Sequence, residues 1–92
     1  MMTPPADRAE LLRHAALECL AARHPVALPL GGIRRRIATM LDWTPTDPDL
    51  VSALALLVDK GLAKSEPDTL GSSVWYSATA DGLLRIERGN GQ

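Results

Sequence analysis

The densest group of charged side chains in the sequence is the run Arg34-Arg35-Arg36. Guanidinium groups bind phosphates as charged, forked donors, so the run could contact a nucleic-acid backbone. Consecutive residues on a helix point in different directions, and with Ile33 and Ile37 inward we expect Arg35 to point straight out. Arg34 and Arg36 then flank it. The alternative is a solvated helix face whose arginine stems cover apolar surface.

The other residue types that could do chemistry do not form a recognisable site. His14 and His24 have no metal-ligand spacing with each other or with a carboxylate, and no serine has a nucleophile motif. Cys19 is the only cysteine, so it has no partner for an intramolecular disulfide. We expect it to be a buried, reduced core thiol, which fits a cytoplasmic protein. The sequence therefore predicts no enzyme activity, no cofactor and no metal.

Size and composition limit the chain to one core. It has 92 residues, 46% of them apolar, and lacks phenylalanine, so leucine, isoleucine, valine and alanine must do most of the packing. No apolar run is long enough to span a bilayer. The net charge is −1, but it is unevenly distributed: residues 1–40 hold six arginines against three carboxylates, and residues 41–70 hold two lysines against six. The chain is basic first and acidic in the middle.

Apolar periodicity and breaker residues predict an alternation of helices and short strands. We expect a flexible N-terminus over 1–7, one domain over 8–88 and a flexible tail over 89–92.

Within the domain we expect a helix capped by Asp7 and ending near His24, with Leu17 on its polar side. A short strand over 26–28 precedes a helix opened by Gly31-Gly32, on which Ile33, Ile37, Met40 and Leu41 face inward and Trp43 caps the apolar face. Asp47 caps a third helix that runs from Pro48 to about Lys60 and is ended by Gly61 as its C-cap, with Leu50, Leu54, Leu57 and Val58 buried. Strands over 62–66 and 73–78 form a hairpin, with Val74, Tyr76 and Ala78 facing the core, and Thr79 caps a last helix.

Two stretches point to a known architecture. The first, Ala53 to Leu62 (ALALLVDKGL), looks like the end of a recognition helix leading into a wing. The second, Tyr76 to Leu84 (YSATADGLL), looks like the return strand of the wing and the start of the closing helix. Together they resemble the winged helix-turn-helix superfamily, which includes MarR-like and PadR-like bacterial regulators. The resemblance implies a mostly helical α+β fold: a three-helix core, a short strand plus a β-hairpin wing, and a short C-terminal helix. It also implies DNA binding, with the third helix in the major groove and the wing on the backbone or in the minor groove.

The third helix departs from that pattern where bases would be read. At 100° per residue its outward positions are Asp49, Ser52, Ala55, Leu56 and Asp59. None of these is arginine, lysine, asparagine or glutamine, the side chains that read base edges best. Apolar Leu56 beside Ala55 suits a protein partner better than a duplex. Trp75, expected to face outward from the hairpin, is a second possible anchor for a protein.

Two hypotheses remain open. The preferred one is a small bacterial transcriptional regulator that contacts the phosphates of double-stranded DNA with Arg34, Arg35 and Arg36 of the second helix. Ser52 and Lys64 are further candidate contacts. The alternative is a winged-helix module that binds another protein, or a second copy of itself, through Leu56, Ala55 and Trp75.

Overall fold

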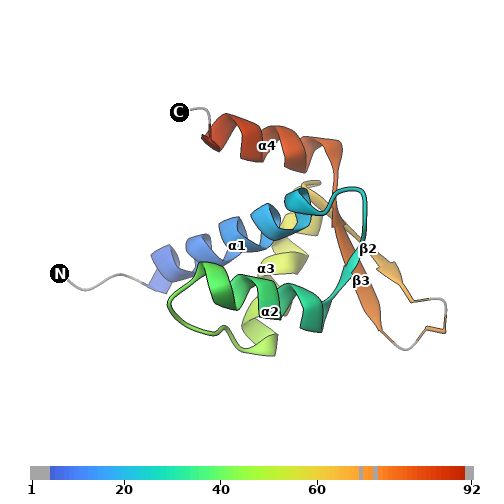
Figure 1. The fold of residues 1–92 in the computed structure, drawn as a ribbon, viewed down its shortest axis with the longest axis horizontal. Coiled ribbons are helices and arrows are strands. Elements are labelled where there is room, and N and C mark those ends of the chain that lie inside the picture. The colour runs from blue at the N-terminus through green and yellow to red at the C-terminus, as the bar shows by residue number, and fades with distance from the viewer. Residues whose placement is uncertain (1–4, 69, 72, 91–92) are drawn as a thin grey trace.

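Four helices and a three-stranded antiparallel sheet form the fold (Figure 1). The computed structural model describes residues 5–68, 70–71 and 73–90. The elements are α1 (Pro5–Ala22), β1 (Leu28–Pro29), α2 (Leu30–Met40), α3 (Asp47–Asp59), β2 (Ala63–Pro67), β3 (Val74–Ala78) and α4 (Ala80–Asn90). The predicted order of elements and the mostly helical α+β class are confirmed. Residues 1–4 and 91–92, predicted to be flexible, lie outside the described residues.

The core lies where α1 crosses α2 and α3 and meets the sheet. It consists almost entirely of aliphatic side chains: Leu12, Ala15, Ala16, Leu17, Cys19, Leu20, Leu28, Ile33, Ile37, Leu50, Ala53, Leu54, Leu57, Ala63, Ala78 and Ile86. The prediction that Leu17 lies on a polar side of its helix is wrong, because α4 also packs against α1 and covers it. In the part of the chain that the structure describes, no helix combines the length and apolar character needed to cross a membrane.

Several helix boundaries differ from the predicted ones by a few residues. The first helix begins at Pro5, whose fixed φ suits a first helical position, so Asp7 lies inside it and is not its cap. It ends at Ala22, before the predicted end near His24. The second helix begins at Leu30, ahead of the two glycines.

The cap of α3 is also displaced by one residue. Thr46, not Asp47, has the extended backbone of an N-cap, and its hydroxyl accepts a hydrogen bond from the Asp49 N–H at 3.2 Å. A threonine hydroxyl caps a helix in the same way as the predicted carboxylate, which is why the sequence did not separate the two. At the other end of α3, Gly61 has a φ of +76°. That left-handed conformation confirms the predicted glycine stop.

The sheet has the order β1-β3-β2, and β3 is its central strand. β1 is later and shorter than predicted because its pairing residues are Leu28 and Pro29, opposite Tyr76 and Trp75. The predicted inward face of β3 is correct for Ala78, which is buried, and for Tyr76, which packs against the core.

Val74 and Met40 are corrections to the predicted core. Val74 is 44% exposed because it pairs with Pro67 at the far end of the hairpin from the buried Ala63–Ala78 pair. Met40 is 43% exposed because α2 ends at this residue, and Leu41 and Trp43 pack against the core in its place.

The first turn of α4 lies directly against the chain that leaves α3. The Thr79 N–H donates to the Leu62 carbonyl at 3.1 Å, and the Thr79 hydroxyl donates to the Gly61 carbonyl at 2.7 Å. The same hydroxyl accepts from the Gly82 N–H at 3.1 Å, which confirms Thr79 as the cap of this helix. A side chain at Gly82 would collide with the Leu62 carbonyl. These contacts fix α4 across α1.

Candidate nucleic-acid interface

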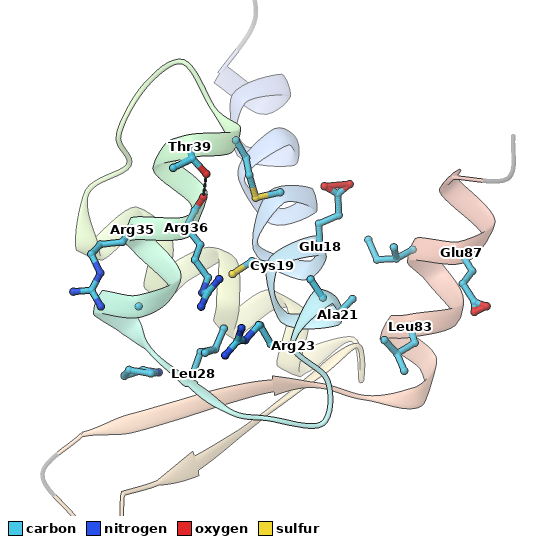
Figure 2. Close-up of a pocket in the computed structure, with 15 residues that line it drawn as sticks. Glu18, Cys19, Ala21, Arg23, Leu28, Arg35, Arg36, Thr39, Leu83 and Glu87 are labelled. Carbon is cyan, nitrogen blue, oxygen red and sulfur yellow. Dashed lines mark hydrogen bonds between the residues drawn. The ribbon is translucent and has the colours of Figure 1, made fainter.

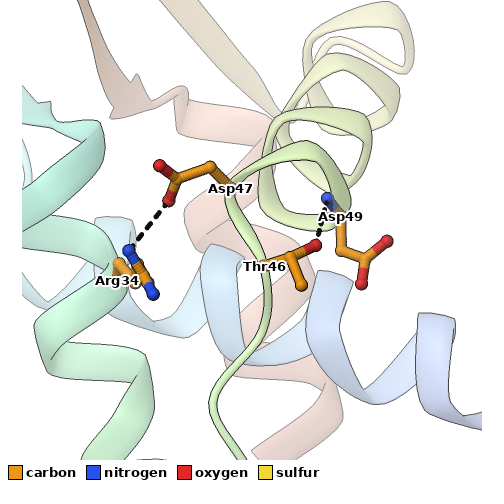
Figure 3. Close-up of polar contacts among 4 residues, drawn as sticks. All are labelled: Arg34, Thr46, Asp47 and Asp49. Atoms are coloured by element: carbon orange, nitrogen blue, oxygen red, sulfur yellow. Dashed lines mark hydrogen bonds and ion pairs between the residues drawn. The ribbon is translucent and has the colours of Figure 1, made fainter.

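The three consecutive arginines of α2 are exposed, but they do not act on one surface. Arg34 points toward the start of α3, where its Nη1 lies 3.2 Å from Oδ1 of Asp47 (Figure 3). Both side chains are about half exposed, with 44% and 56% of their surface accessible. A surface ion pair of this kind contributes up to about 1 kcal/mol and partly compensates the charge of Arg34.

Arg35 and Arg36 line a groove between α1, α2 and α4, which we name the arginine groove (Figure 2). Its volume is about 970 Å³. Arg23, the first residue after α1, lines the same groove, and in Figure 2 it points toward the region reached by Arg36. The sequence analysis missed Arg23. Its place just after α1 was visible in the sequence, but its approach to α2 depends on how the two helices cross.

The floor of the arginine groove is apolar, and its far side contains carboxylates. Leu28, Met40, Leu83 and Ile86 line it together with Cys19. Glu18 of α1 and Glu87 of α4 also line it. Neither is in an ion pair with Arg23, Arg35 or Arg36 among the ion pairs of the described residues. The three guanidinium groups therefore form a positively charged side that is open to an anion.

Cys19 is buried, as predicted, and it also lines the arginine groove. Burial raises its pKa above the ordinary value, and the charges of Arg36 and Arg23 oppose that shift in part. The burial effect is the largest, so Cys19 is a protonated thiol at neutral pH. It belongs to the packing of the groove floor.

The outward face of α3 contains no strong base-reading side chain. Asp49, Ser52, Ala55 and Asp59 are exposed, as predicted. Val51, which the sequence analysis did not place on this side, is also 42% exposed. Val51 lies about 100° around the helix from the buried Leu50, so helical spacing alone did not predict whether its side chain is buried or exposed. An acidic and apolar face of this kind is poorly suited to the major groove of DNA.

Leu56 and Ser52 line a second groove, which we name the α1–α3 groove. It lies between the first half of α1, the segment 42–46 and α3, and its volume is about 1180 Å³. Leu56 is half-buried there, so it is less exposed than its outward position predicted. Trp43 also lines this groove, and the guanidinium of Arg8 lies 4.3 Å from the centre of its ring.

The remaining candidates lie outside both grooves. Lys64 is exposed on β2, and its Nζ is 3.9 Å from Oε1 of Glu66. Trp75, predicted to face outward, is half-buried, and its indole N–H is buried without a hydrogen-bond partner among the described residues. Ala55 is exposed on α3. Leu56 therefore lines the α1–α3 groove without Ala55 or Trp75, and Lys64 does not line the arginine groove.

The two histidines take part in local contacts. Nε2 of His14 lies 3.3 Å from Oε2 of Glu18, one turn along α1. Nδ1 of His24 lies 3.1 Å from the carbonyl oxygen of Ala78. Within residues 5–68, 70–71 and 73–90, no group of three metal-ligating side chains is assembled.

Solved structures with the same arrangement include transcriptional regulators and a winged-helix DNA-binding protein. A MarR-family transcriptional regulator from Silicibacter pomeroyi is 24% identical, over 85% of this chain and 47% of its own, with a TM-score of 0.70. A PadR-like transcription factor from Bacteroides fragilis is 17% identical, over 94% of this chain and 82% of its own, with a TM-score of 0.76. F93 from STIV, a winged-helix DNA-binding protein, is 19% identical, over 85% of this chain and 82% of its own, with a TM-score of 0.69.

The chain spans about half the length of several of the solved structures that it matches. No protein-family model and no curated protein sequence matches it. At these sequence identities the likeness concerns the fold alone. Combined with the element order and the hairpin, it shows that this chain has the winged-helix fold.

Proposed function

We propose that this chain binds double-stranded DNA as a small transcriptional regulator, and that the arginine groove contacts the phosphates. The observation that supports the proposal is the grouping of Arg35 and Arg36 with Arg23 along one groove. Each is exposed, and none is in an ion pair with a carboxylate of the described residues. The winged-helix structures named above, regulators and a DNA-binding protein, support the same function.

Binding through phosphates is consistent with the positive charge of the arginine groove and with the acidic outer side of α3. The exposed side of α3 has Asp49 and Asp59 but no arginine, so it would contribute little direct base readout. Phosphate contacts position a protein on DNA without reading its sequence. A single copy of the chain is therefore proposed to have low sequence selectivity for duplexes. The proposal makes the chain a binding protein, not an enzyme, and places it in a bacterial cytoplasm, where Cys19 stays reduced.

The expected result is a salt-dependent affinity for duplex DNA that falls when the arginine groove loses charge. Each phosphate contact contributes about 0.9 to the slope of log K against log salt concentration. Replacing Arg35 and Arg36 together with glutamine should therefore reduce that slope by roughly two. Fluorescence anisotropy of a labelled duplex, titrated at several salt concentrations, measures both the affinity and the slope.

A matched control removes the same charge from another surface. Lys60→Gln with Arg85→Gln also deletes two positive charges, but neither residue lines the arginine groove. This control should keep the wild-type slope. Equal losses in both double variants would mean that only net charge matters, and the absence of any binding by the wild type at low salt would refute the proposal.

The second candidate function is protein binding through α3 and the hairpin. The observation that favours it is the exposed apolar surface of α3, where Val51 is 42% exposed and Ala55 lies nearby. Leu56→Glu and Trp75→Ala, with the fold intact by circular dichroism, should then abolish complex formation. Wild-type complex formation by both folded variants would refute this candidate function.

A further inference from the structure

We propose that two copies of this chain pair face to face through the α1–α3 groove. The groove combines an open volume of about 1180 Å³ with an apolar floor formed by Leu12, Trp43 and Pro45. Leu11 lies on the α1 side of the groove and is 53% exposed. Its large apolar side chain is thus left largely uncovered by the described residues. A two-fold contact requires a surface that contains both a protruding group and the hollow that receives it. This groove contains both.

The charges of the groove are also arranged to complement a second copy. The α1 side contributes Arg8 and Arg13, and the opposite side contributes Asp42 and Asp49. None of the four is in an ion pair among those of the described residues. When two such grooves meet about a two-fold axis, the basic side of each copy faces the acidic side of the other. A second copy therefore pairs with both the basic side and the acidic side of the groove. A partner with charge of a single sign would pair with only one of them.

The stacking of Arg8 on Trp43 prepares the basic side for this contact. The guanidinium lies 4.3 Å from the ring centroid, so Arg8 is held over the groove instead of extending into solvent. A side chain that is already positioned loses less conformational entropy when a partner binds. Leu11 lies about one helical turn further along α1, so the positioned guanidinium of Arg8 is close to the exposed apolar side chain in the same groove.

Pairing through this groove leaves the arginine groove free. Arg23, Arg35 and Arg36 line the other groove, between α1, α2 and α4, and do not contribute to the α1–α3 groove. The inference is therefore independent of the proposed function. Pairing would also cover Ser52 and Asp49 of α3, so the paired molecule would present still less of α3 to a duplex.

Charge reversal on either side of the groove tests the proposal. The acidic variant has Arg8→Glu and Arg13→Glu, and the basic variant has Asp42→Lys and Asp49→Lys. Each variant alone places like charges opposite one another, and we expect its self-association to be more than about 100-fold weaker than that of the wild type. An equimolar mixture of the two restores attraction on both sides and should form a heterodimer. Analytical ultracentrifugation measures all three states.

Control variants place the same charges elsewhere. Lys60→Glu with Arg85→Glu matches the charge change of the acidic variant, and Asp59→Lys with Asp81→Lys matches that of the basic variant. Asp81 lies in the first turn of α4, as Asp49 lies in the first turn of α3, so the loss of a carboxylate at a helix start is also matched. Both controls should pair as the wild type does. A wild type that stays monomeric at every soluble concentration would overturn the proposal. So would charge-reversed variants that are folded, by circular dichroism, and still pair.

Discussion

Replacing Gly82 with alanine is expected to destabilise the fold by about 3 kcal/mol or more, the upper range for a forced steric conflict. The new Cβ would collide with the Leu62 carbonyl oxygen and lie 3.1 Å from Cδ1 of Leu17. Backbone cannot give way as the end of a flexible side chain can. Thr79 is bonded to Gly61 and Leu62 at the same point, so α4 would have to move off α1. Thermal unfolding should show a midpoint lower by roughly 15 °C.

Gly31 provides the matched control, because it is also a glycine near the start of a helix. A Cβ at Gly31 would have no atom within 4 Å. Gly31→Ala should therefore stabilise the chain by about 0.5–1 kcal/mol through helix propensity and a less disordered unfolded state. If Gly82→Ala were as harmless as Gly31→Ala, the packing of α4 against Leu62 described above would be wrong.

Truncation of Leu54 to alanine should cost about 3–4 kcal/mol of unfolding free energy. Leu54 is fully buried in α3 and belongs to the core shared by α1, α2 and the sheet. The substitution removes apolar surface and leaves a cavity that the surrounding aliphatic side chains fill only in part. Chemical denaturation of the purified variant measures the loss.

Leu84→Ala is the corresponding change at a surface position. Leu84 is 47% exposed on α4, and its truncation should cost less than about 1 kcal/mol. Similar losses for Leu54→Ala and Leu84→Ala would contradict the assignment of the core. The comparison is direct because both variants delete the same atoms from a helix.

The sequence predicted the elements whose signals are local. The apolar spacing of Leu50, Leu54 and Leu57 placed the inner side of α3, and Gly61 marked its end. These signals depend only on helical geometry and on the conformation that glycine allows. The same reasoning failed by one residue at Thr46 and Asp47, because both types cap helices well.

The candidate site was predicted less completely because it is assembled from distant segments. Leu17 was assigned to a polar side, since nothing in α1 shows that α4 will cover it. Arg23 joins Arg35 and Arg36 only through the crossing of α1 and α2. Arg34, although adjacent in sequence, pairs with Asp47 instead. Such relations depend on the packing of helices and cannot be deduced from the spacing within any one of them.

The surfaces described above divide the molecule between two kinds of contact. The arginine groove presents positive charge. The α1–α3 groove has basic and acidic sides around an apolar floor, and the outer side of α3 is acidic and apolar. A winged helix with an acidic third helix is therefore proposed to use α2 and the end of α1 for DNA. The α1–α3 groove remains available for a second copy.

An amide and arginine side-chain correlation spectrum, recorded as a short duplex is added at low salt, tests this division most directly. The account predicts that the signals of Arg23, Arg35 and Arg36 shift most and that those of α3 change little. Largest shifts at Val51, Ser52 and Ala55 would contradict it, because DNA would then bind the outer side of α3. A spectrum that does not change at all would refute DNA binding itself.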